Sequence, residues 1–165
     1  MLTSCSYLCL RSMPFNYSAY LSFAQGLGRT SIKAHEEKNE ALSEVCARNA
    51  CSRAYYAVFH GAISFLRNID DEVIPEWDFN HDGVWKHFRV ASRLDIWQDV
   101  KELKNWREWA DYNTPGKDQP ASMKQVFDTV GTVKVALLTI CQSKGKNPSR
   151  CWFLTAETKL QDGSS

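Results

Sequence analysis

The sequence predicts an all-α protein, an up-and-down bundle of about five helices, and three observations support this fold class. First, apolar residues recur every three to four positions in several segments, which is the repeat of a helix with one buried face. Second, no segment of the sequence shows the sustained apolar–polar alternation of a half-buried strand. Third, the chain has 165 residues, 44% of them apolar and 24% charged, which suits one domain with a real core and excludes a wholly disordered chain.

The first predicted helix covers residues 17–27, where apolar side chains, among them Phe23, follow a helical spacing. We expect this helix to end at Gly28, because glycine is common just beyond the last residue of a helix. The polar residues 29–39 that follow fit either a loop or the exposed beginning of the next helix.

The central helix is predicted over residues 40–67 and carries the strongest helical pattern in the chain. One seam along it is spaced alternately by four and three residues: Val45, Asn49, Ser52, Tyr56, Phe59, Ile63 and Leu66. Small residues lie beside the seam and allow other helices to approach closely: Ala50, Ala54, Ala57 and Gly61. We therefore expect this helix to lie in the centre of the bundle, in contact with several others.

Three further helices are predicted downstream. The third covers residues 83–91, and Asp82 is expected to cap its first turn. The fourth covers residues 94–112 and stops at a turn sequence with proline and glycine. The fifth covers residues 123–140 and is followed by a linker at residues 143–149.

The domain organisation expected from these elements is one helical domain at residues 13–142. Residues 1–12 are expected to form an unstructured extension before it, and residues 143–165 a linker and C-terminal tail. Within the tail, the apolar residues 152–154 are candidates for docking on the bundle.

Composition and motifs exclude several classes of function. Twenty Lys and Arg against nineteen Asp and Glu give a formal net charge of +1, which excludes a generally basic nucleic-acid-binding surface but not a local basic groove. The six cysteines contain no CxxC pair, so we expect a cytoplasmic protein with no disulfide framework, no metal and no cofactor. The absence of a long apolar run predicts no membrane span, and phosphate-loop, dinucleotide-binding and zinc-protease motifs are also missing.

Two groups of residues could carry chemistry. Arg53 and His60 lie two turns apart on the central helix, about 10 Å along its axis, and project from the same side. They could face an anionic group such as a phosphate. Alternatively, Arg53 pairs with a carboxylate of a neighbouring helix and His60 bonds a backbone carbonyl.

The second group lies at the end of the fourth helix. Arg107 and Asp111 are spaced to meet on one helical face, and Tyr112 follows close to the same side. The three residues could hold a phosphodiester, or they could form an ion pair and a tyrosine lid that fix the loop. His81 and His87 are six residues apart, poorly spaced for two ligands, and are expected to be a cap-region residue and a surface residue.

In order along the chain, SRAYYAVFH at residues 52–60, Gly83-Val-x-x-x-Phe88 and Arg107-x-x-x-Asp111-Tyr112-Asn113 resemble the HEPN family of small helical domains. The resemblance covers residues 15–140, and SRAYYAVFH is similar to the branch of the family that ends in an RxxADY motif. It implies an up-and-down helical bundle that commonly forms a homodimer.

The resemblance also implies candidate functions. Many HEPN domains are metal-independent endoribonucleases, in which Arg and His residues of two protomers form a composite site; the His acts on the ribose 2′-hydroxyl or the leaving oxygen, and the Arg stabilises charge on the phosphate. Others are toxins paired with a nucleotidyltransferase antitoxin, parts of phage-defence systems, or non-catalytic modules.

This chain departs from the active signature of the family, because Tyr112 stands where the catalytic His is usual. A tyrosine, with an ordinary pKa near 10, is a poor general base at neutral pH. Arg53 and His60 have a suitable Arg-to-His spacing but lie on the central helix.

Three functions are therefore open. The first is an RNA-cleaving toxin or defence effector with Arg107, Asp111, Tyr112 and His60 as catalytic residues and Arg53 as an RNA phosphate ligand. The second is a catalytically silent HEPN module that binds a nucleotide, a nucleic acid or a nucleotidyltransferase. The third is a helical dimerisation unit whose polar residues only stabilise the bundle.

Overall fold

The computed structural model describes residues 16–69, 80–90, 94–113 and 118–160, and the expected N-terminal extension at residues 1–12 lies outside these ranges. The fold is an all-α bundle, as predicted, and the described residues contain no strand. Its elements in chain order are α1 (Tyr17–Glu36), α2 (Glu40–Asn68), α3 (His81–Val90), α4 (Leu94–Tyr112), α5 (Met123–Ser143), the 3-10 helix η2 (Pro148–Arg150) and α6 (Trp152–Thr155).

The first helix is longer than predicted, because α1 continues through Gly28 to Glu36. Gly28 is buried, and a Cβ atom at this position would lie 2.8 Å from Cε2 of Phe127 on α5. The glycine therefore permits the close approach of α5 and does not end the helix. Phe23, expected on the buried face, is 58% exposed.

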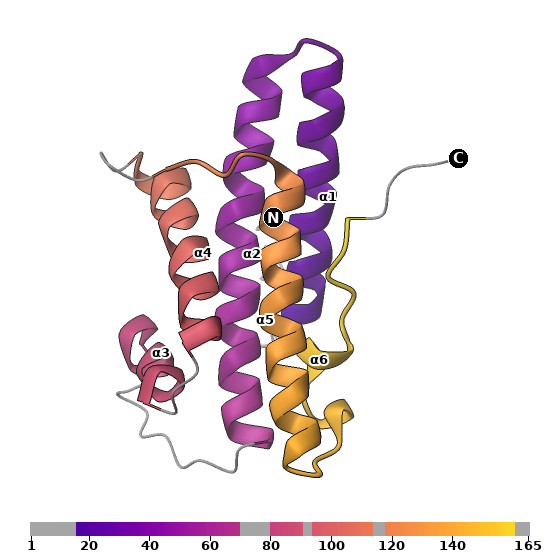
Figure 1. The fold of residues 1–165 in the computed structure, drawn as a ribbon. Helices are drawn as coiled ribbons and strands as arrows, with labels where there is room; N and C mark the ends of the chain where they lie inside the picture. Colours follow the sequence, from indigo (N-terminus) through magenta and orange to yellow (C-terminus); the bar gives the residue numbers. More distant parts are fainter. Residues whose placement is uncertain (1–15, 70–79, 91–93, 114–117, 161–165) are drawn as a thin grey trace, which may run out of the picture.

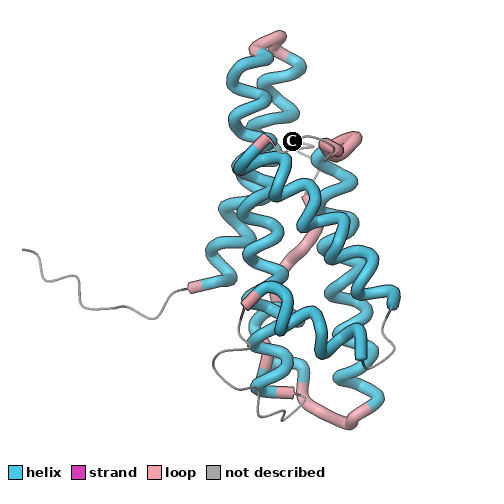
Figure 2. Tube along the Cα trace, turned by 90° about the vertical axis from the view of Figure 1, so that its left-hand side faces the viewer, coloured by secondary structure: helices cyan, strands magenta, loops and turns pink. Residues whose placement is uncertain are grey.

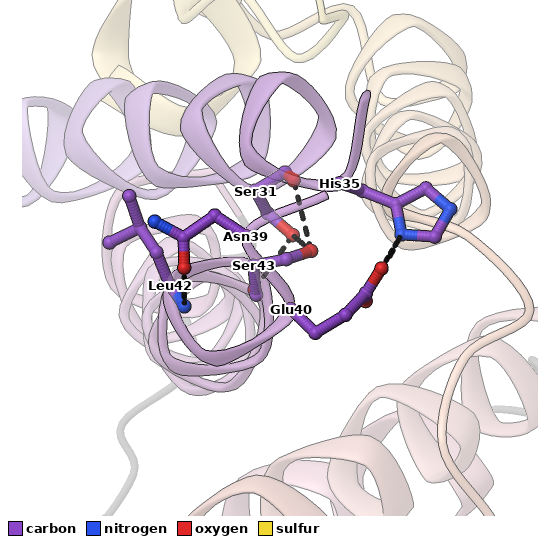
Figure 3. A network of polar contacts seen from close by, with 6 residues as sticks. All are labelled: Ser31, His35, Asn39, Glu40, Leu42 and Ser43. Carbon is purple, nitrogen blue, oxygen red and sulfur yellow. Dashed lines mark hydrogen bonds and ion pairs between the residues drawn. The ribbon is translucent and has the colours of Figure 1, made fainter. Parts of the chain in front are cut away.

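The turn between α1 and α2 is fixed by local polar contacts (Figure 3). Asn39 caps α2, because its Oδ1 accepts a hydrogen bond from the backbone N–H of Leu42 at 3.2 Å. Ser31 and Ser43 each donate a side-chain hydrogen bond to the backbone carbonyl of the other, at 2.9 and 3.0 Å. Lys38 in this turn has a φ of 61°, in the left-handed region that reverses the chain between the two helices.

The second helix lies in the centre of the bundle, as predicted, and packs on α1, α3, α4, α5 and α6 (Figure 1). Its most deeply buried positions include the small residues Ala50, Ala54 and Ala57, each with no exposed surface. The predicted seam is wrong at its start, because Val45 is 57% exposed and Asn49 is also exposed. In Figure 1 the upper ends of α1 and α2 extend beyond α4 and α5, so α2 has fewer neighbours there.

The third helix is capped by a different residue from the one predicted. Oδ1 of Asn80 accepts hydrogen bonds from the backbone N–H groups of Asp82 and Gly83, at 3.1 and 2.8 Å. Asp82 thus lies within the first turn of α3 and is not its cap. The predicted C-terminal end of this helix, at residue 91, lies outside the described ranges.

The fifth helix, α5, packs its apolar face into the bundle. Of the helices that the structure describes, it alone is long and apolar enough to cross a membrane, judged by length and composition. Its inward positions are buried against the other helices: Met123, Val126, Phe127, Val130, Val133, Leu137 and Cys141. This is the pattern of a core helix.

The segment after α5, expected as a linker and tail, packs on the bundle over residues 148–160. Phe153 and Cys151 have no exposed surface and belong to the core. The amide of Gln25 on α1 donates hydrogen bonds to the backbone carbonyls of Glu157 and Lys159, at 3.0 and 3.1 Å. Figure 2 shows this segment returning along the helices. The packing brings α6 against α2.

Candidate functional site

A cavity of about 420 Å³ lies on the α1–α2 face and is lined by Tyr17, Tyr20, Arg53, Tyr56 and His60. All five side chains are partly buried. The two turns of helix between Arg53 and His60 place both on one side of α2, as the spacing predicts. We call this space the arginine cavity.

Arg53 is held by a tyrosine of the neighbouring helix. Its Nη1 donates a hydrogen bond to the hydroxyl of Tyr20 on α1, and its guanidinium lies 5.3 Å from the centre of that ring. Within the described ranges no carboxylate pairs with Arg53, and none lines the arginine cavity. The alternative in which Arg53 pairs with a carboxylate is therefore not met, and no ion pair within the described ranges neutralises its positive charge.

His60 stacks on Tyr17, with ring centres 4.0 Å apart and planes 24° from parallel. Among the residues described, its ring nitrogens make no hydrogen bond, so the predicted alternative of a bond to a backbone carbonyl is not met either. Burial lowers the pKa of His60 below its ordinary value, and nearby His81 lowers it further. At neutral pH the imidazole is therefore uncharged and can accept a proton.

Arg107, Asp111 and Tyr112 come together at the C-terminal end of α4, as predicted. Nη2 of Arg107 donates hydrogen bonds to the hydroxyls of Tyr112, at 3.0 Å, and of Tyr56, at 2.8 Å. Its Nε lies 2.8 Å from Oδ2 of Asp111. The Nε–H is not aligned with this oxygen, so the contact is an ion pair without a hydrogen bond.

The guanidinium of Arg107 is well enclosed, because its side chain is 13% exposed, whereas Tyr112 is 64% exposed. Burial alone lowers the pKa of Arg107, but Tyr56, Asp111 and Tyr112 together raise it above its ordinary value. Arg107 is thus a permanent positive charge, partly balanced by Asp111.

Tyr56 connects the two predicted groups. Its ring lines the arginine cavity with Arg53 and His60, and its hydroxyl accepts the hydrogen bond from Arg107. Arg107, Asp111 and Tyr112 do not themselves line this cavity and reach it only through Tyr56. Sequence reasoning missed this role of Tyr56, although its position three residues after Arg53 and four before His60 places it on the same helical face.

His81, expected as a cap-region residue, is the first residue of α3 and does not line the arginine cavity. Its Nδ1 lies 2.9 Å from the hydroxyl of Tyr55, which also accepts a hydrogen bond from Nε1 of Trp85 at 3.2 Å. The ring of Phe59 lies 4.4 Å from His81 and 5.2 Å from His60, centre to centre. Burial, together with the charges of Arg107 and Lys104, lowers the pKa of His81.

We expect the free energy of unfolding to decrease as the pH falls below about 6.5, the ordinary pKa of an unfolded histidine. His60 and His81 have lowered pKa values in the folded protein, so the unfolded chain binds these protons more readily and acidification favours unfolding. The contribution of the two neutral histidines to the free energy of unfolding is complete above this pH. It is lost as the pH falls through the pKa values of His60 and His81 in the folded protein.

Guanidinium unfolding at pH 7.5 and 5.5 measures this effect. The double variant His60→Asn/His81→Asn should lose less stability between the two pH values than the parent protein. The variant Arg29→Gln, at an exposed position of α1, should show the pH dependence of the parent. If the double variant shows the same pH dependence as the parent, His60 and His81 are not the source of the loss of stability at low pH.

The acidic, histidine and cysteine side chains of the described ranges form no cluster of three or more that could hold a metal ion. Cys46, Cys51, Cys141 and Cys151 are buried and free. Burial raises the pKa of the Cys51 thiol to about 12, so it stays protonated.

The comparisons with known proteins add no assignment. No family model matches the chain, and no curated protein or solved structure is significantly similar to it.

Proposed function

We propose that this protein is a metal-independent endoribonuclease of the HEPN kind, a cytoplasmic toxin or phage-defence effector that binds an RNA phosphate in the arginine cavity. The observation that carries the proposal is the placement of Arg53, His60 and Tyr56 around one cavity that no described carboxylate lines. An uncompensated guanidinium attracts an anion, and a neutral imidazole beside it can take a proton from a hydroxyl.

The reaction follows from the roles of three side chains. His60 accepts the proton of the ribose 2′-hydroxyl, and the oxygen attacks the adjacent phosphorus. The bond from phosphorus to the 5′-oxygen breaks, and that oxygen takes the hydroxyl proton of Tyr56. Arg53 stabilises the negative charge on the phosphate. The products are a 2′,3′-cyclic phosphate and a 5′-hydroxyl end, and no metal, oxidant or cofactor is consumed.

Arg107 acts through Tyr56 in this scheme. Because the Tyr56 oxygen accepts a hydrogen bond from Arg107, its own hydrogen is available to the substrate. The guanidinium then stabilises the negative charge that develops on the phenolic oxygen. Asp111 and Tyr112 fix the orientation of Arg107, so the three residues predicted as catalytic become positioning residues.

A second candidate is a catalytically silent HEPN module that forms a homodimer and binds RNA, a nucleotide or a nucleotidyltransferase partner. The observation that favours it is the state of Arg107, whose charge is already paired with Asp111. In addition, Tyr112 stands in place of the histidine that the HEPN signature carries. RNA would then bind in the arginine cavity without being cleaved.

Cleavage of a labelled single-stranded RNA in excess chelator tests the first candidate. We expect His60→Asn to lower the cleavage rate by about 10²–10⁴-fold, the usual contribution of a general base. His35→Asn, at an exposed side chain in the last turn of α1, is the matched control and should leave the rate unchanged. Mass spectrometry should identify cyclic phosphate ends on the products. If RNA binds but is not cleaved, and binding needs Arg53, the second candidate replaces the first.

A further inference from the structure

A second cavity, of about 440 Å³, adjoins the arginine cavity and shares Tyr17 and His60 with it. Trp152, Ser64, Arg67 and Asn68 are among its other lining residues. It is called the tryptophan cavity here. His60 stands between Arg53 and Arg67, seven residues from each, so the two cavities follow one face of α2 for about 20 Å.

The wall of the tryptophan cavity is a stack of aromatic rings. Tyr17 lies between His60 and Trp152, with ring centres 4.0 and 6.2 Å away and planes within 24° and 21° of parallel. Trp152 is partly exposed and belongs to α6, which is held in place by the fully buried Phe153. Flat ring faces on a rigid support are the usual platform on which proteins stack nucleic-acid bases.

The residues that α2 contributes to this cavity include a pair of polar side chains. The amide nitrogen of Asn68 donates to the backbone carbonyl of Ser64, at 2.9 Å, and to its hydroxyl oxygen, at 3.3 Å. Oδ1 of Asn68 accepts no hydrogen bond from the described residues, and the Ser64 hydroxyl hydrogen can donate. An acceptor and a donor side by side match the edge of a nucleobase. No carboxylate among the described residues lines the cavity.

We infer that the tryptophan cavity binds one nucleobase of a single-stranded RNA whose neighbouring phosphate lies in the arginine cavity. The inference rests on the proposed function and extends it to the kind of RNA that the site accepts. Bases in a duplex are stacked and paired, whereas an unpaired base can turn out and stack on an aromatic side chain. The substrate is therefore an unpaired segment, held by a base on one side of His60 and by a phosphate on the other.

Fluorescence anisotropy with short 2′-O-methyl oligoribonucleotides tests this inference, because they lack the 2′-hydroxyl and are not cleaved. One probe is a tetranucleotide with all four of its bases present. The second is an abasic probe, which has the same backbone but no bases. The parent protein should bind the first about tenfold more tightly, as expected for one stacked base. Trp152→Leu should abolish this difference without changing the binding of the base-free probe. Trp97→Leu, on α4 and in neither cavity, should preserve it.

Each outcome separates the two proposals. Equal binding of both probes by the parent, or equal weakening of both by Trp152→Leu, would overturn the base site and leave the arginine cavity intact. If the parent protein binds neither probe, or if Arg53→Ala does not weaken the binding, the result would instead count against the proposed function. Asn68→Ala, at an exposed position, provides a variant that should fold even if Trp152→Leu does not. For this test, four homopolymeric 2′-O-methyl probes, one for each base, are compared, and the parent protein should bind them with different affinities. Asn68→Ala should reduce these differences, and unchanged differences would contradict the base site.

Discussion

Replacement of Arg107 by alanine should lower the rate of RNA cleavage by about 10²–10³-fold, the usual effect of removing a group that stabilises developing negative charge. The reason is indirect, because Arg107 does not line the arginine cavity and contacts Tyr56, which does. Without the guanidinium, the phenolic oxygen of Tyr56 loses the donor that stabilises its negative charge. Steady-state kinetics should show the loss mainly in kcat and little in KM, since Arg53 remains to bind the phosphate.

A double-mutant cycle distinguishes this role from a merely structural one. If Arg107 acts through Tyr56, then Arg107→Ala should cause little further loss in a protein that already carries Tyr56→Phe. Arg107→Lys should restore part of the rate, and Arg29→Ala, at an exposed position of α1, is the matched control. Fully additive losses would show that Arg107 contributes independently of Tyr56. Unfolding in guanidinium should accompany the kinetics, because Arg107→Ala also leaves Asp111 without its ion pair.

Substitution of Gly61 by alanine should destabilise the protein by about 3 kcal/mol, the largest stability effect that we expect of a single added methyl group. A Cβ atom at this position would lie 2.5 Å from Cγ and 2.8 Å from Cβ of Phe153. Because the clash reaches the base of the Phe153 side chain, rotation of its ring does not relieve it, and α6 must move. Loss of a buried phenylalanine costs about 3–5 kcal/mol, and the better helix propensity of alanine returns up to about 1 kcal/mol.

Gly26 provides the control for this prediction, because it lies within α1 and no atom would come within 4 Å of an added Cβ. Gly26→Ala should therefore stabilise the protein by up to about 1 kcal/mol. Chemical denaturation of both variants measures the two effects, which should have opposite signs. A neutral or stabilising effect of Gly61→Ala would show that α6 can move away from α2 at no cost.

The helices could be predicted from the sequence because each buries one face, and the apolar residues of that face recur every three to four positions. The errors arose where burial depends on a distant partner. A glycine such as Gly28 is expected both at the end of a helix and where a neighbouring side chain, here Phe127, packs closely against the helix. Only the path of α5 distinguishes these two cases. Val45 continues the apolar seam of α2, but α2 extends beyond the helices that would cover it.

The candidate site was predictable where its residues share one helix. Arg53 with His60, and Arg107 with Asp111, follow from helical geometry alone. The link between these pairs was not predictable, because the contact of Tyr56 with Arg107 depends on how α4 packs against α2. Trp152 belongs to an element placed by tertiary packing, and the apolar run at residues 152–154 indicated docking on the bundle but not that Trp152 lines a cavity.

The hydrogen bonds from Gln25 to the carbonyls of Glu157 and Lys159 join positions 132 and 134 residues apart. Such contacts close nearly the whole chain into a loop, so they form after the local helical hairpins during folding. During translation, the α1–α2 hairpin and its arginine cavity can assemble while later helices are still being synthesised. Trp152 is synthesised much later, so under the two proposals made above the proposed phosphate site would be complete on a nascent chain before the proposed base site.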